Sequence, residues 1–219
     1  MLRFDIITIF PHILDSYFAE AQIKRAKAKK LIEIFVHDLR DYAKDKHRTT
    51  DDVPYGGGVG MLMKVEPVEK CVEEILKKSP YKRNEIRIIL LAAKGKIFNQ
   101  KKSLELSKKY KQIIFVCGRY EGVDERVINH IADEEISMGK YILSGGELGA
   151  ATILDSVTRL IPGVLGNEES LKEESYNTNE TEYPQYTRPE VYKGWKVPSV
   201  LLCGDPKKIE KWRRKQMDK

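Results

Sequence analysis

Cysteine and histidine are scarce in this sequence of 219 residues, which has 3 cysteines and 4 histidines. The cysteines, at 71, 117 and 203, are odd in number and form no C-x-x-C pair, so they indicate no disulfide framework and favour a reducing compartment. Each lies among apolar neighbours, and we expect all three in the core. The histidines lack the spacing of a metal site, so we predict no metal ligands.

Long hydrophobic runs are also missing. The longest, at 88–93, is far shorter than the roughly 20 residues of a membrane-spanning helix. Arg3 and Asp5 interrupt the apolar start of the chain, which argues against a secretory signal core. We therefore predict a cytoplasmic protein with no membrane partner.

The usual nucleotide-binding fingerprints are absent. Met61 and Leu62 follow the densest glycine cluster, at 56–60, where a P-loop would have Lys-Ser or Lys-Thr. The cluster also lacks the third glycine of the dinucleotide fingerprint. These absences exclude both common classes of nucleotide-binding loop.

What the sequence does have is an alternation of strand-like and helical segments. Apolar runs predict strands at 4–10, 31–39, 86–91 and 113–117, with a short one around Ile136. Pro11 is expected to open a helix, and further helices are predicted at 68–76, 99–110, 124–131 and 147–161. Asn99 is the expected N-cap of the helix at 99–110. The repeated order predicts an α/β fold with a parallel sheet.

The composition changes after Pro162, where a polar stretch with few branched apolar residues begins. We predict a main domain at 1–163, a flexible interdomain linker at 164–184 and a small, mainly helical C-terminal domain at 185–219. A basic helix is expected to begin at Pro206.

Basic residues exceed acidic ones by 39 to 33, giving a net charge of +6. They crowd into two segments, 24–30 and 207–219. Such runs are either solvated helix faces or patches that contact phosphates.

Several glycine-containing loops follow predicted strands. Gly95 follows the third strand, Gly118 and Gly122 follow the fourth, and Gly145 and Gly146 follow an apolar segment at 141–143. Because ligands bind at the carboxyl ends of strands in open α/β sheets, these loops favour a planar ligand held by backbone groups. Ordinary strand-to-helix turns are the alternative.

Five motifs stand out, at 47–58 with 60–63, at 116–128, at 141–148, at 155–159 with 161–166, and at 186–190. Together they resemble the bacterial tRNA (guanine-N1)-methyltransferase family. The resemblance extends in order from residue 1 to about residue 216, and secondary structure alone dictates none of these motifs.

The resemblance implies the fold and activity of a SPOUT methyltransferase. Such a chain is expected to form a deep trefoil knot in its S-adenosylmethionine-binding catalytic domain, 1–163, and a homodimer with each active site at the subunit interface. The C-terminal domain would bind tRNA. The expected reaction methylates N1 of the guanine 3′ of the anticodon, position 37, and the family suggests a requirement for Mg²⁺.

The cofactor-binding residues that the resemblance implies are mainly glycines and apolar residues of the loops. They are Leu91, Gly95, Gly118, Tyr120, Glu121, Gly122, Met138, Gly139, Lys140, Tyr141, Ile142, Leu143, Gly145 and Gly146.

The chemistry requires a proton acceptor near guanine N1 and a cation or donor near O6, because N1 is a poor nucleophile while it is protonated. Arg159 matches the family arginine that stabilises O6. The family's aspartate base is replaced here, and counting from Arg159 puts Glu174 in its place, with Glu173 as the alternative.

Two other functions stay open. One is a SPOUT ribose 2′-O-methyltransferase, which would need no base for a ring N–H. The other is a non-catalytic tRNA-binding module, which the change from aspartate to glutamate would favour.

Overall fold

The computed structural model describes residues 1–165 and 182–217. The chain divides into two compact units, Met1–Gly166 and Asn167–Lys219. The larger unit contains the sheet and the cavity described below.

The larger unit is built on a five-stranded parallel sheet, as the sequence predicts. Its strand order is β2-β1-β6-β5-β7, and every pair is parallel. The strands are β1 (Leu2–Thr8), β2 (Ile32–Asp38), β5 (Ile86–Ile97), β6 (Gln112–Cys117) and β7 (Glu134–Ser137). Since all strands run the same way, their carboxyl ends meet at one edge of the sheet.

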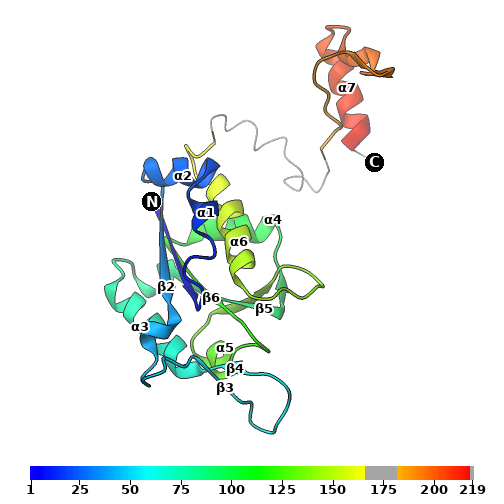
Figure 1. Ribbon diagram of the computed structural model, residues 1–219. Coiled ribbons are helices and arrows are strands. Elements are labelled where there is room, and N and C mark those ends of the chain that lie inside the picture. The colour runs from blue at the N-terminus through cyan, green and yellow to red at the C-terminus, as the bar shows by residue number, and fades with distance from the viewer. Residues whose placement is uncertain (166–181, 218–219) are drawn as a thin grey trace. The chain divides into compact units, whose positions relative to one another are not determined.

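Helices cover both faces of this sheet (Figure 1). One face packs against α1 (Asp15–Phe18), α2 (Ala21–Ala28), α4 (Gln100–Lys109) and α6 (Glu147–Arg159). The other packs against the 3-10 helix Leu39–Tyr42, α3 (Val65–Lys78) and α5 (Arg126–His130). Successive residues of a strand point to opposite faces of the sheet. In β5, Ile89 belongs to the hydrophobic core on the first face and Ile88 to the core on the second face. A short 3-10 turn, Arg83–Glu85, precedes β5.

Three sequence expectations need correction. The helix expected after Pro11 is two helices, α1 and α2, because the extended backbone of Glu20 interrupts the helical path. Strand β5 continues to Ile97, beyond the predicted end at 91. Cys203 is exposed, whereas Cys71 and Cys117 are buried as expected.

The glycine cluster at 56–60 lies between two short antiparallel strands, β3 (Asp51–Asp52) and β4 (Leu62–Met63). The end of this hairpin contacts the loop after β6. The Met63 N–H donates to Gly122 O at 3.0 Å, and the Glu121 N–H donates to Met61 O at 3.1 Å. The first family-like motif thus contacts the second.

The smaller unit contains a short hairpin, β8 (Val191–Tyr192) and β9 (Trp195–Lys196), a 3-10 turn (Ser199–Leu201) and α7 (Pro206–Met217). Tyr186 packs against Trp212 of α7, with ring centroids 6.5 Å apart, and the Arg213 guanidinium lies 4.6 Å from the centroid of the Tyr183 ring. The basic helix expected from Pro206 is therefore present. Across both described ranges, every helix is too short or too polar to cross a membrane.

Candidate active site

A cavity of about 720 Å³ lies beside the second half of β5 and the carboxyl ends of β6 and β7. Three segments form most of its walls: residues 90–94 of β5, the loop 118–123 after β6, and the segment 138–146 that leads into α6. Backbone from two of these walls meets directly, because the Gly146 N–H donates to Gly118 O at 2.9 Å. The cavity is therefore bounded by segments that lie far apart in the sequence.

Eleven of the fourteen predicted cofactor-binding residues line this cavity. They are Leu91, Gly118, Tyr120, Glu121, Gly122, Met138, Tyr141, Ile142, Leu143, Gly145 and Gly146. Gly95, Gly139 and Lys140 do not line it. Gly95 instead allows β5 and β7 to approach closely, since a Cβ there would lie 2.6 Å from the backbone carbon of Glu135.

Arg119 also lines the cavity, and sequence reasoning missed it. Its Nε donates to Glu147 Oε2 at 3.0 Å, its Nη2 lies 3.0 Å from the same oxygen as an ion pair, and its Nη1 donates to Ser144 O at 3.1 Å. Thr8 Oγ1 donates to the same carboxylate at 2.6 Å. Arg119 stands inside a family-like motif, but its pairing with a residue 28 positions later is not visible in the sequence.

Three acidic side chains line the cavity. Glu121, Glu125 and Glu135 line it together with Lys94. Lys94 pairs with Glu125 and lies 3.6 Å from Glu135 Oε1. The hydrogen bond with Glu125 raises the pKa of Lys94, so the cavity has a fixed positive charge between carboxylates.

Cys117 lies at the end of β6, immediately before the loop that forms one wall. It is fully buried, and burial raises the pKa of its thiol, with the neighbouring Glu147 carboxylate adding to the shift. A thiol held neutral in this way is a poor nucleophile. Cys117 therefore belongs to the packing of the site and not to its chemistry.

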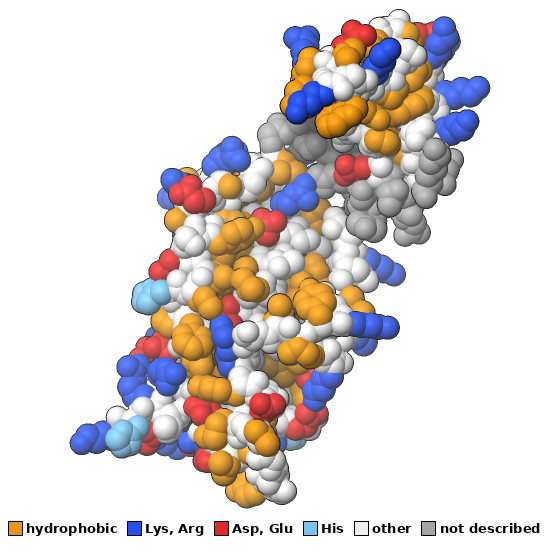
Figure 2. Space-filling model, turned by 45° about the vertical axis from the view of Figure 1, so that its right-hand side comes forward, with side chains coloured by type: hydrophobic (Ala, Val, Ile, Leu, Met, Phe, Trp, Pro, Cys, Tyr) orange, Lys and Arg blue, Asp and Glu red, His pale blue; other side chains and the backbone are white. Residues whose placement is uncertain are grey.

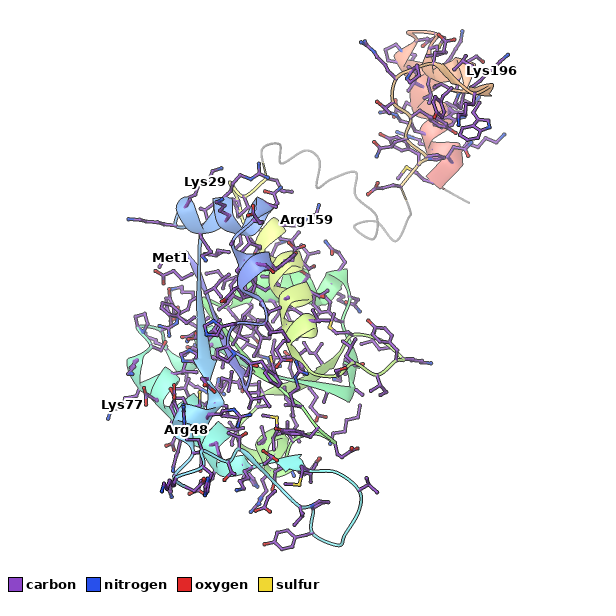
Figure 3. The ribbon with its side chains drawn as sticks, viewed as in Figure 1. Met1, Lys29, Arg48, Lys77, Arg159 and Lys196 are labelled. Atoms are coloured by element: carbon purple, nitrogen blue, oxygen red, sulfur yellow. The ribbon has the colours of Figure 1, made fainter. Side chains whose placement is uncertain are left out.

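Of the predicted catalytic residues, Arg159 does not line this cavity. Arg159 is the last residue of α6, whereas Gly146 at the cavity immediately precedes the same helix. Thirteen helical residues separate the two ends by about 18 Å. Figure 3 shows Arg159 at the end of α6 near α2, the helix that Lys29 follows. Glu173 and Glu174 lie outside the described residues.

Within 1–165 and 182–217, no group of three or more His, Cys, Asp or Glu side chains is arranged to hold a metal ion.

The structure defines an α/β protein with a cavity at the carboxyl ends of β6 and β7 in a parallel sheet. A family model described as "tRNA (Guanine-1)-methyltransferase TrmD" matches residues 2–219. This chain belongs to that family.

Curated relatives agree with this assignment, and three of them bear the name "tRNA (guanine-N(1)-)-methyltransferase". The protein of Dictyoglomus turgidum is 51% identical over 99% of this chain and 85% of its own length. That of Clostridioides difficile is 47% identical over 98% of this chain and 92% of its own length. One protein of Dehalococcoides mccartyi is 45% identical over 98% of this chain and 85% of its own length.

Proposed function

We propose that this enzyme transfers a methyl group from S-adenosylmethionine to N1 of the guanine 3′ of the anticodon in tRNA, at position 37. The observation that supports this most is the glycine-bounded cavity at the carboxyl edge of the sheet, in a chain of the tRNA (guanine-1)-methyltransferase family. The products are N1-methylguanosine and S-adenosylhomocysteine.

The cavity suits S-adenosylmethionine in size and in chemistry. Its volume of about 720 Å³ lies within the usual range for small-molecule sites. Leu91, Met138 and Leu143 offer apolar surface for a purine ring. Gly118, Gly145 and Gly146 carry no side chain, so the backbone there can approach a ligand closely. When bound, S-adenosylmethionine supplies a methyl group on a sulfonium, which is already a good leaving group.

The chain's own residues must handle the guanine. We assign removal of the N1 proton to Glu174, with Glu173 as the alternative, because a positioned general base contributes about 10² to 10⁴-fold in rate. We assign Arg159 to O6, where negative charge develops as N1 loses its proton, an effect worth on the order of 10² to 10³-fold.

In a homodimer, we expect Arg159 of one chain to lie at the cavity of the other chain. Gly149, which lines the cavity, and Arg159 are ten residues apart on α6, a rise of about 15 Å that exceeds the reach of an arginine side chain, so in this conformation Arg159 does not reach the cavity of its own chain. In a homodimer with shared sites, it would serve the partner's cavity. The proposed dimer therefore gives both ends of α6 a role.

One face of the larger unit has the character of such an interface. Phe10, Ile13, Tyr17 and Leu148 are large apolar side chains that stay about half exposed. Burial and a hydrogen bond with Asp155 raise the pKa of Tyr17, so α1 lies against α6 there. Figure 2 shows hydrophobic side chains gathered on the forward face of this unit, with basic ones mainly at its margins.

Three further expectations belong to the same proposal. The trefoil knot is supported by family membership and by the contact between 146 and 118. Binding of tRNA by the smaller unit is supported by the lysines and arginines of α7. The Mg²⁺ requirement rests on the family resemblance alone, and no step above depends on it.

The test measures transfer of labelled methyl to tRNA transcripts with guanine or adenine 3′ of the anticodon. We expect the wild type to label only the guanine transcript and Glu174→Gln to be nearly inactive, while the neighbouring control Glu173→Gln retains activity. The reverse pattern would move the base to Glu173, and full activity of both variants would remove it from either glutamate.

The position of the label separates the remaining functions. Digestion of the product should place the label on the base, whereas label on ribose would identify a 2′-O-methyltransferase. Wild-type protein that binds tRNA and transfers no methyl would identify a binding module.

A further inference from the structure

Arg119 and Glu147 form a buried ion pair that joins two walls of the cavity. Arg119 follows β6 in the loop 118–123, and Glu147 begins α6 directly after the segment 138–146. The Glu147 side chain is 1% exposed and that of Arg119 is 16% exposed. Thr8, buried at the end of β1, adds a third element through its hydrogen bond to Glu147.

The guanidinium of Arg119 is held by several contacts. Nε donates to Glu147, Nη2 lies 3.0 Å from the same carboxylate, Nη1 donates to the carbonyl of Ser144, and the group lies 4.7 Å from the centroid of the Phe10 ring. It also lies directly on the backbone of Gly145, because a Cβ at Gly145 would be 2.1 Å from Arg119 Nε. One side chain thus touches both cavity walls and sets the distance between them.

An ion pair of this kind contributes little net stability to the fold. Removing both charges from water costs several kcal/mol, and an apolar pair of similar volume would often stabilise the fold as well or better. What the pair offers instead is geometry, since the planar fork of arginine contacts a carboxylate and a carbonyl in fixed directions.

We propose that Arg119 and Glu147 act as positioning residues: their ion pair fixes the spacing of the loop 118–123 and the turn 144–146, and so orients the S-adenosylmethionine bound between them. The inference rests on the proposed function for the identity of the ligand. Neither residue takes part in the chemical step.

The test uses Arg119→Lys, which keeps the charge but loses the fork, and Glu147→Gln, which keeps an acceptor for Thr8 but loses the charge. The matched control is Arg87→Lys. Arg87 pairs with Glu134 at 2.7 Å, with side chains 24% and 16% exposed, and neither residue lines the cavity.

The first readout is the affinity for S-adenosylhomocysteine by isothermal titration calorimetry, which needs no methyl transfer. We expect Arg119→Lys and Glu147→Gln to weaken binding by about 10- to 100-fold, as small misplacements of binding groups do. The double variant should be little worse than either single one, because both remove the same pair. Arg87→Lys should bind like the wild type.

The second readout is the thermal midpoint together with the steady-state constants. Arg87→Lys should lower the midpoint about as much as Arg119→Lys, while only Arg119→Lys raises the KM for S-adenosylmethionine, with the KM for tRNA unchanged. Thr8→Ser, which retains the hydroxyl, should behave like the wild type.

Unchanged S-adenosylhomocysteine affinity in Arg119→Lys would overturn the inference, and so would equal loss of affinity in Arg87→Lys. Either result leaves methylation by the wild type intact. If the wild-type enzyme itself bound no S-adenosylhomocysteine, the proposed function would fail instead.

Discussion

His37 and Asp5 face each other from neighbouring parallel strands, with His37 Nε2 2.8 Å from Asp5 Oδ1. Asp5 is fully buried. Its carboxylate also accepts from Arg3 Nε and Nη2, at 2.8 and 2.7 Å, and from Gln112 Nε2 at 2.7 Å. Three elements of the chain therefore meet at one buried charge, in the middle of a strand whose other residues are mostly apolar.

Asp5→Asn should destabilise the larger unit strongly. The variant leaves Arg3 without its charged partner and gives His37 an amide in place of a carboxylate. Breaking a buried pair by removing one partner costs about 3 to 5 kcal/mol. Urea denaturation followed by circular dichroism measures the change in the free energy of unfolding.

The matched control for this prediction is Asp15→Asn. Asp15 also pairs with a histidine, His12, at 2.8 Å, but both side chains are exposed. That change should cost less than about 1 kcal/mol, as for other surface pairs. Equal effects of the two variants would show that burial of Asp5 adds nothing.

The same carboxylate gives the stability a defined dependence on pH. Burial by itself would raise the pKa of Asp5, but the hydrogen bonds from His37, Arg3 and Gln112 outweigh burial and lower the pKa below its usual value. Asp5 therefore binds a proton more readily in the unfolded chain than in the folded one. Its contribution is present above the unfolded pKa of about 3.9 and is lost as the pH falls through the folded pKa.

The measurable consequence is the difference in unfolding free energy between the wild type and Asp5→Asn. This difference should be constant around neutral pH and should narrow on acidification below about pH 4. A difference that widens on acidification would contradict the direction of the shift.

The parallel sheet was predictable from the sequence because its strands are apolar runs separated by segments with a helical period. The N-cap Asn99 was predictable because capping depends only on residues close in the sequence, and its Oδ1 accepts from the Lys102 N–H at 3.0 Å. The break between α1 and α2 was not predictable, because the apolar pattern continues across Glu20 while the backbone does not.

The cavity was only partly predictable. The glycine loops could be placed at the carboxyl edge, since that position follows from strand direction alone. The ion pair between Arg119 and Glu147 was not predictable, because residue spacing does not show which of many charged side chains meet in the folded protein. The distance between Arg159 and the cavity was not predictable either, because it depends on the direction in which α6 runs away from the cavity.

Gly146 and Gly149 lie three residues apart at the start of α6, and their substitution by alanine should have opposite outcomes. A Cβ at Gly146 would lie 2.8 Å from Cys117 Cα and 2.9 Å from Leu91 Cβ, which are fixed by the sheet. The three atoms nearest to a Cβ at Gly149 all belong to side chains: Leu91 Cδ1 and Met138 Cγ at 3.1 Å and Met138 Sδ at 3.5 Å.

Gly146→Ala should therefore cost about 1 to 3 kcal/mol and weaken binding of S-adenosylhomocysteine, because the helix must move away from the sheet at the cavity. Gly149→Ala should be tolerated, since flexible side chains can give way and alanine favours a helix by up to about 1 kcal/mol. Thermal unfolding and calorimetry of both variants provide the comparison. A tolerated Gly146→Ala would show that the helix can shift without cost.

Arg159→Ala tests whether the two ends of α6 serve different active sites. The variant should lose about 10² to 10³-fold in methyl transfer, because the charge that develops on O6 is no longer stabilised. Its affinity for S-adenosylhomocysteine should stay near that of the wild type, because Arg159 does not line the cavity.

Mixing this variant with Gly146→Ala tests directly whether Arg159 serves the cavity of the partner chain. In a dimer with shared sites, a mixed pair assembles one intact site from the cavity of the Arg159→Ala chain and the arginine of the Gly146→Ala chain. Random exchange of subunits should then restore about a quarter of wild-type activity, since half of the dimers are mixed and each has one intact site. If the mixture showed only the summed activities of the two variants, Arg159 would have to act within its own chain, and α6 would have to bend or move during the reaction to bring it there.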